Sequence, residues 1–208
     1  MMMRFPIAAL IGAMTATVMS AVMSPVMAQT VCPTAADLTR GIKVEYADGA
    51  TEIFRAGDAG IVSVKGLNAE GQGYEMDLAH GLHLVMYQNT ENGAPLTVSQ
   101  VYYDYGIPPA ELPIPIPGKR WQSGVTVTAS DGERGEPQVH AYDAVVTEMI
   151  GDCSYDMISA LISYETSDLY TENVHYLPAL GIGYLVWNET TDQPRDPVPA
   201  VSVSALRK

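Results

Sequence analysis

The chain has 208 residues with 11 basic and 24 acidic side chains, which gives a formal net charge of −13 at neutral pH. This charge repels phosphate backbones and anionic lipid head groups, so it disfavours nucleic-acid binding and adhesion to a membrane surface. The length is that of one domain with a substantial core.

Residues 1–28 have the features of a cleaved secretory signal peptide. Arg4 is followed by an uncharged, mostly apolar run, and the run ends at Val26-Met27-Ala28, a small-x-small cleavage signature. A membrane span is the competing interpretation, but serine and proline interrupt the run and no basic cluster follows it. We therefore predict an exported, periplasmic protein that has no membrane span after cleavage.

Cys32 and Cys153 both follow the predicted cleavage site. Two cysteines in an oxidising compartment are usually paired, so we predict a Cys32–Cys153 disulfide that ties the N-terminus to a late strand. A redox role is disfavoured, because there is no Cys-x-x-Cys motif and neither cysteine has a basic neighbour. Acylation of Cys32 is a further alternative, but Gln29-Thr30-Val31 lacks the small residue that precedes a lipoprotein cysteine.

The first elements of the mature chain are a short helical turn and a hairpin. Thr34 can cap a turn over residues 34–40, and Gly41 can end it. The segment Ile42–Arg55 predicts a hairpin around Asp48-Gly49, in which Tyr46 lies opposite Thr51 and Val44 opposite Ile53.

Later runs rich in Val, Ile, Thr and Tyr alternate with Gly, Pro, Asn and Asp clusters, and we expect roughly ten strands in all. The further strands are expected at Ile61–Lys65, Tyr74–Ala79, Leu82–Tyr87, Leu96–Tyr105, Gly124–Ala129, Val139–Met149, Cys153–Tyr164, Asn173–Leu177 and Gly183–Asn188. The alternation slips at Ser99-Gln100 and at Met157-Ile158, which indicates bulges and a bent sheet. The predicted fold is therefore mainly β: a single curved antiparallel sheet, half-barrel or barrel-like, with one N-terminal helical turn.

Two segments do not have strand patterns. Pro108–Pro117 contains five prolines with apolar residues between them, and we expect a cover over one end of the sheet, with a lid or docking segment as alternatives. Residues 189–208 have few apolar positions and are expected to be a mobile, proline-containing tail. One β domain is thus predicted over residues 29–188.

The C-terminal part of this domain resembles a known family. Gly151-Asp152-Cys153-Ser154-Tyr155-Asp156 opens a long strand, and Val174-His175-Tyr176-Leu177-Pro178-Ala179-Leu180-Gly181-Ile182-Gly183-Tyr184-Leu185 follows it. This order resembles the closing hairpin of LolA-like periplasmic half-barrel proteins, and it is closer still to uncharacterised exported proteins of alphaproteobacteria. The resemblance covers roughly Cys153–Asn188 and implies a half-barrel that handles lipid or acyl chains. It supplies no catalytic residues, and the glycines have a sufficient structural role in a tight turn.

The sequence contains no enzyme motif that names a reaction. His80 and His83 could share a metal with Asp77 only if Gly81 breaks the strand between them, so we predict no metal site and no cofactor. Glu75, Asp77, Glu148 and Asp152 could pair across strands as acid and base, as in a hydrolase, but any acidic β protein offers such pairs. We predict no catalytic residues.

The expected function is that of a non-enzymatic binding or carrier module for an apolar or amphipathic envelope molecule. The candidate lining residues of its cavity are Met86, Tyr103, Met157 and Ile162. The alternative is a protein-interaction subunit of a cell-envelope complex, and a hydrolase is the third possibility. The partner is accordingly a lipid or other apolar ligand, or an envelope protein.

Overall fold

The computed structural model describes residues 31–165 and 169–207, so the predicted signal peptide lies outside the described residues. Two antiparallel sheets make up most of this part of the chain, and its helices are three short turns, η1 (Ala35–Thr39), η2 (Thr97–Ser99) and η3 (Pro109–Glu111). The predicted mainly β, antiparallel class is confirmed. No helix in the described part is long and apolar enough to cross a membrane.

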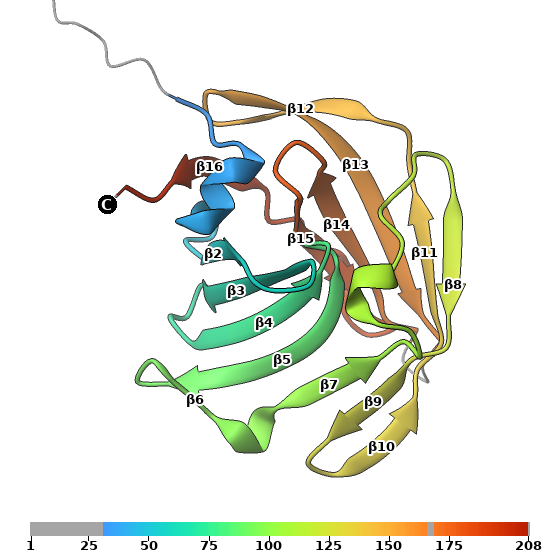
Figure 1. Cartoon of the computed structure of the whole chain (residues 1–208). Helices are drawn as coiled ribbons and strands as arrows, with labels where there is room; N and C mark the ends of the chain where they lie inside the picture. The colour runs from blue at the N-terminus through green and yellow to red at the C-terminus, as the bar shows by residue number, and fades with distance from the viewer. Residues whose placement is uncertain (1–30, 166–168, 208) are drawn as a thin grey trace, which may run out of the picture.

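The larger sheet has ten strands in the order β10-β9-β7-β5-β4-β3-β2-β1-β16, and β6 pairs with β5 (Figure 1). Its strands are β1 (Ile42–Tyr46), β2 (Thr51–Ala56), β3 (Ile61–Leu67), β4 (Gly73–Ala79), β5 (His83–Glu91), β6 (Ala94–Pro95), β7 (Val101–Asp104), β9 (Thr126–Ala129), β10 (Gly132–Gly135) and β16 (Ala200–Ala205). The sequence predicts about ten strands in all, and this sheet alone has ten of the sixteen strands in the described residues.

A second sheet of six strands accompanies it, in the order β15-β14-β13-β11-β8, and β12 pairs with β13. Its strands are β8 (Arg120–Ser123), β11 (Gln138–Tyr142), β12 (Val146–Ile150), β13 (Cys153–Tyr164), β14 (Thr171–Leu177) and β15 (Ile182–Glu189). In the described residues neither sheet closes into a barrel. The largest apolar cluster is built from both sheets and includes Phe54 of β2 and Ile182 of β15.

The first hairpin differs from its predicted register by one residue. Thr51 lies opposite Glu45 rather than Tyr46, and Val44 lies opposite Glu52 rather than Ile53. The connection is longer than a two-residue turn, because the Tyr46 N–H donates to the Ala50 carbonyl at 3.0 Å. A shift of one residue exchanges the two faces of a strand.

This shift places Glu52 inside the protein. Its side chain is buried, and its carboxylate accepts hydrogen bonds from the hydroxyls of Tyr46 and, at 2.7 Å, Tyr74. Burial raises the pKa of the Glu52 carboxyl and of both tyrosines. The two tyrosines thus satisfy a buried acid that the predicted register placed on the opposite face from Tyr46.

The long strand β13 changes its inward face at Met157 and Ile158, where two consecutive residues are buried. Tyr142 pairs with Ala160 and Val146 pairs with Met157, so residues 143–145 lie opposite only two residues of β13. The predicted bulge is therefore confirmed, and it splits the expected Val139–Met149 strand into β11 and β12. At the other predicted slip, near Ser99-Gln100, the chain forms η2, and β7 begins only at Val101.

The predicted mobile tail is wrong for residues 200–205, which form β16 along β1. Val203 is buried, and the Ser202 hydroxyl donates to the Glu45 carboxylate at 2.5 Å. These few apolar residues need not fold alone, because the open edge of β1 supplies backbone partners for them. The β domain extends accordingly beyond residue 188.

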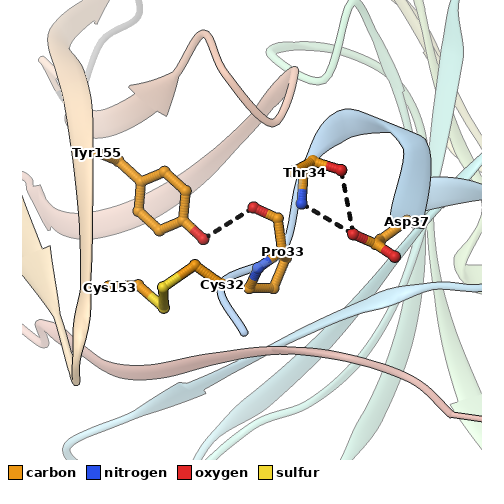
Figure 2. The surroundings of a disulfide bond; sticks show 6 residues. All are labelled: Cys32, Pro33, Thr34, Asp37, Cys153 and Tyr155. Atoms are coloured by element: carbon orange, nitrogen blue, oxygen red, sulfur yellow. Dashed lines mark hydrogen bonds between the residues drawn. A yellow bond between two sulfur atoms is a disulfide. The ribbon is translucent and has the colours of Figure 1, made fainter. Parts of the chain in front are cut away.

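The predicted disulfide between Cys32 and Cys153 is present, with 5.6 Å between the two Cα atoms and 121 positions between the residues (Figure 2). The Tyr155 hydroxyl donates to the Pro33 carbonyl at 3.1 Å beside it. A disulfide and a hydrogen bond therefore attach the N-terminal segment to β13. A disulfide of this kind is typical of exported proteins.

The predicted N-terminal helical turn follows directly. The Thr34 N–H donates to the Asp37 carboxylate at 2.9 Å, and Gly41 ends the turn with a positive φ of 123°. Figure 2 shows Thr34 and Asp37 next to the disulfide. Leu38 of this turn is buried in the largest apolar cluster.

The backbones of the two sheets touch at a pair of glycines. Gly81, between β4 and β5, accepts a hydrogen bond from the Gly183 N–H at 2.7 Å. A Cβ atom on Gly81 would lie 2.1 Å from the carbonyl oxygen of Gly181, in the turn between β14 and β15. No side chain fits here, so the two turns meet as bare backbone.

Removal of the disulfide should reduce stability strongly, because the bridge restricts a long loop of the unfolded chain. We expect the Cys32→Ser, Cys153→Ser double variant to lose roughly 4–5 kcal/mol of unfolding free energy. Urea denaturation followed by fluorescence measures the loss, and reduced wild-type protein should show the same loss. A difference under about 1 kcal/mol would contradict the assignment of a stabilising role.

Gly81→Ala should be far more harmful than Gly93→Ala. Both glycines have a positive φ, of 70° and 78°, but a Cβ on Gly93 meets no atom within 4 Å. Backbone strain alone should cost about 1–2 kcal/mol at Gly93, whereas the clash at Gly81 should add about 2 kcal/mol or more. Equal losses in parallel urea titrations would show that the sheets do not meet here.

Candidate functional site

A pocket of about 290 Å³ lies between the two sheets. Leu84 of β5 and Tyr103 of β7 line it from the larger sheet. The smaller sheet and its connections contribute the remaining residues, Glu136, Gln138, Tyr164, Tyr170 and Glu172. The pocket therefore depends on how the two sheets are placed against each other.

Glu172 is fixed by two tyrosine hydroxyls. Tyr164 donates to one carboxylate oxygen, and Tyr170 donates to the other at 3.3 Å. The chain brings these residues together because the Tyr164 N–H donates to the Tyr170 carbonyl at 2.9 Å, which closes the connection from β13 to β14. Burial raises the pKa of the Glu172 carboxyl, and the charge of Glu136 raises it further, against the lowering effect of both hydroxyls.

Glu136 is the second acid of the pocket, and its side chain is buried. Its backbone N–H donates to the Val125 carbonyl at 2.7 Å, and its carboxylate accepts a hydrogen bond from the Gln138 amide at 3.2 Å. The guanidinium of Arg134 lies 3.9 Å from the other carboxylate oxygen and is half exposed. The burial of Tyr103 opposite raises its pKa to about 12, so this tyrosine is neutral at physiological pH.

The polar wall of the pocket continues into a buried aromatic cluster. The side-chain oxygen of Gln138 accepts a hydrogen bond from Tyr105 at 3.3 Å and lies 3.1 Å from Nε2 of His140. The rings of His140 and His83 are 5.1 Å apart, and both rings contact Trp121. The cluster therefore joins β5, β8 and β11 across the two sheets.

The proline segment caps this cluster. The carbonyl oxygen of Pro113 accepts a hydrogen bond from Nε2 of His83 at 2.8 Å, and Leu112 is buried beside it. The Gly118 N–H donates to the Tyr142 carbonyl at 2.9 Å, so the segment is attached to both sheets. Figure 1 shows η3 of this segment between the sheets. These contacts favour a packed cover over a lid.

The pocket combines two carboxyl groups with three tyrosine rings. Both oxygens of Glu172 already accept hydrogen bonds, which holds the carboxylate in place. Donors of this kind stabilise the charged form of an acid and orient it toward a ligand.

Of the predicted lining residues, Tyr103 lines the pocket and the other three do not. Ile162 is buried next to the pocket, opposite Glu172, whereas Met157 faces the largest apolar cluster because β13 changes face there. Met86 pairs with Tyr102, which is half exposed, so it shares the outer face of the sheet with that residue. Met86 is therefore wrong as a lining residue.

The three metal-site candidates are not gathered together. The Asp77 carboxylate accepts a hydrogen bond from Ser63 at 2.6 Å, and His83 points to Pro113. His80 has a positive φ of 51° in the turn before β5. Within residues 31–165 and 169–207, no group of three or more His, Cys, Asp or Glu side chains has the geometry to hold a metal ion.

Of the acids suggested as carboxylate pairs, Glu75 and Glu148 have basic, amide or hydroxyl partners. Glu75 pairs with Lys65 at 2.7 Å, and Glu148 contacts His175 at 2.9 Å and Tyr184 at 2.8 Å. Each of these acids is therefore held within the structure by its own neighbours.

Sequence reasoning missed the two acids of the pocket, Glu136 and Glu172. A signal for them exists in the alternation of the strands. Gln138, His140 and Tyr142 occupy the buried positions of β11, and Glu172 shares the parity of buried Val174 and Tyr176. Polar residues at inward positions are costly unless they have partners or a ligand.

No family model matches this chain, and no curated protein matches it. Among solved structures, the hypothetical lipoprotein YmcC from Escherichia coli K12 is similar in arrangement, with a TM-score of 0.40 and 10% sequence identity. The similar part covers 78% of this chain and 81% of that chain. We therefore infer function from the residues of this chain.

The buried histidines should make the protein less stable in mild acid. Burial lowers the pKa of His83 to about 4 and that of His140 to about 3, and no acceptor is found for a proton on the Nδ1 atom of either ring in the described residues. In the unfolded chain both titrate near pH 6.5. Stability should therefore be complete above that value and fall as the pH drops toward 4, by up to roughly 1.4 kcal/mol per pH unit for each histidine.

Urea titrations at pH 7 and pH 5 measure this dependence. His140→Phe keeps an aromatic ring but removes one titrating group, so its loss of stability between the two pH values should be smaller than that of the wild type. An unchanged pH dependence in the variant would show that His140 is not held neutral in the folded protein.

Proposed function

We propose that this chain is an exported, periplasmic binding protein that holds an amphipathic envelope molecule between its two sheets without transforming it. The observation that carries the proposal is the pocket of about 290 Å³ whose walls come from both sheets. Preformed concave sites with a few placed polar groups are the usual places where small molecules bind. The predicted signal peptide and the disulfide support export.

The size of the pocket limits what enters it. Pockets that enclose whole drug-sized molecules have volumes of roughly 300–1,000 Å³, and this one is at the lower end. It has room for a head group, and Leu84 is its one aliphatic wall residue. The apolar part of an amphipathic ligand would therefore extend out of the pocket.

Native mass spectrometry of the mature protein, purified from a periplasmic extract without detergent, tests this proposal. We expect a reproducible added mass on the folded protein. Leu84→Phe should fill part of the pocket and remove the added mass, whereas Leu67→Phe, at a half-exposed position on β3, should keep it. A bare wild-type mass in repeated preparations would overturn the proposal.

A protein-interaction subunit of an envelope complex is the second candidate. The observation in its favour is that three isoleucines are exposed by 42–58%: Ile107, directly before the proline segment, and Ile114 and Ile116 within it. Exposed apolar residues that cluster on one segment favour contact with another protein. Co-purification of an envelope protein with a bare mass of this chain would favour it over the binding protein.

A further inference from the structure

We propose that the pocket recognises an alkylammonium group, so that the ligand enters it with a positively charged end. The inference rests on the proposed binding function and names the chemistry of the group that is bound. The buried acid Glu136, the half-buried acid Glu172, three tyrosine rings and the absence of an ion-pair partner for Glu172 among the described residues carry it.

The charge of the pocket is not balanced by the chain. Glu136 and Glu172 both line it, and Arg134 approaches Glu136 at 3.9 Å from a half-exposed position. Among the described residues, no lysine, arginine or histidine forms an ion pair with Glu172. An ionised acid taken out of water is stabilised by hydrogen bonds and by a nearby opposite charge. Tyrosine hydroxyls supply the hydrogen bonds of Glu172, and a cationic ligand would supply the opposite charge.

The aromatic walls suit the same kind of group. The rings of Tyr164 and Tyr170 are 5.0 Å apart and inclined at 55°, so they form a corner, and Tyr103 lies on the wall from the opposite sheet. The face of an aromatic ring attracts cations, and rings of this kind surround quaternary ammonium groups in aromatic cages. Glu172 adds a carboxylate beside the corner.

The hydrogen bonds within the wall disfavour other ligands. Tyr164 and Tyr170 donate their hydroxyl protons to Glu172, so these donors are not available to a sugar or an anion. The other polar lining groups are the Glu136 carboxyl, the Gln138 amide and the Tyr103 hydroxyl. Two carboxylates in one pocket repel an anion.

The raised pKa of the Glu172 carboxyl is consistent with a cationic ligand. Burial and the neighbouring charge of Glu136 raise the pKa of its carboxyl. A cation placed between the two acids would offset both effects, because an opposite charge favours the ionised form of each acid.

Isothermal titration calorimetry of the mature, disulfide-intact protein with choline chloride tests the inference. The matched control is 3,3-dimethyl-1-butanol, which has the same shape without the charge. We expect choline to bind at least about tenfold more tightly than this neutral isostere, as a cation inside an aromatic site should. Equal affinity for the two compounds, or no binding of choline, would overturn the inference.

Two variants test whether choline binding depends on Glu172. Glu172→Gln keeps the shape of the side chain but removes its charge, and it should weaken choline binding by about tenfold or more. Glu70→Gln makes the same change at an exposed position between β3 and β4, outside the pocket lining, and should leave binding unchanged. Equal weakening in both variants would show that only the net charge matters, which contradicts a site at Glu172.

A second titration identifies the source of the ammonium group. Dihexanoylphosphatidylcholine, used as a monomer, carries the same group as a lipid head. Binding of both compounds supports a lipid ligand, and binding of choline alone supports a free amine.

The failure of this inference can be told apart from the failure of the proposed function. An added mass in native mass spectrometry that extraction identifies as a neutral or anionic molecule, combined with no choline binding, would overturn the inference and keep the binding function. A bare mass together with no choline binding would overturn both.

Discussion

The hydrogen bond between Gly81 and Gly183 fixes how the two sheets meet. Sheets that face each other are usually held apart by side chains, at about 10 Å. Here the turn between β4 and β5 touches the turn between β14 and β15 as backbone, and a Cβ on Gly81 would lie 2.1 Å from a carbonyl oxygen. The sheets are joined closely at this point, and the disulfide attaches the N-terminal segment to β13 at another. The glycine contact comes directly before β5, and Leu84 of this strand lines the pocket.

From the glycine contact, β5 runs through the interior of the protein. Leu82 enters an apolar cluster, His83 enters the aromatic cluster, and Leu84 lines the pocket. Polar groups in this interior are satisfied mainly by one another, through Gln138 and the tyrosines, whereas Glu172 has no cationic partner among the described residues. The proposal of a binding function rests on this pocket between the two sheets.

Local patterns predicted much of the fold. The disulfide, the Thr34 turn, the full length of β13 and its bulge follow from cysteine pairing, capping residues and alternation. The division into two sheets and the β16 strand could not be predicted from local patterns. Both depend on strand edges that exist only in the folded chain. The one-residue shift at Glu45 and Thr51 shows the same limit, since turn geometry decided which face Glu52 occupies. Of the site, Tyr103 was found, while Glu136 and Glu172 were missed because their contacts are set by pairing between distant strands.

A crystal structure of the mature, disulfide-intact protein isolated from the periplasm tests the central claim most directly. The account predicts electron density in the pocket between Tyr103 and Glu172 for a molecule whose positively charged end contacts the rings of Tyr164 and Tyr170. A pocket that is filled by the protein's own side chains, with the carboxyls of Glu136 and Glu172 paired to basic residues of the chain, would contradict it.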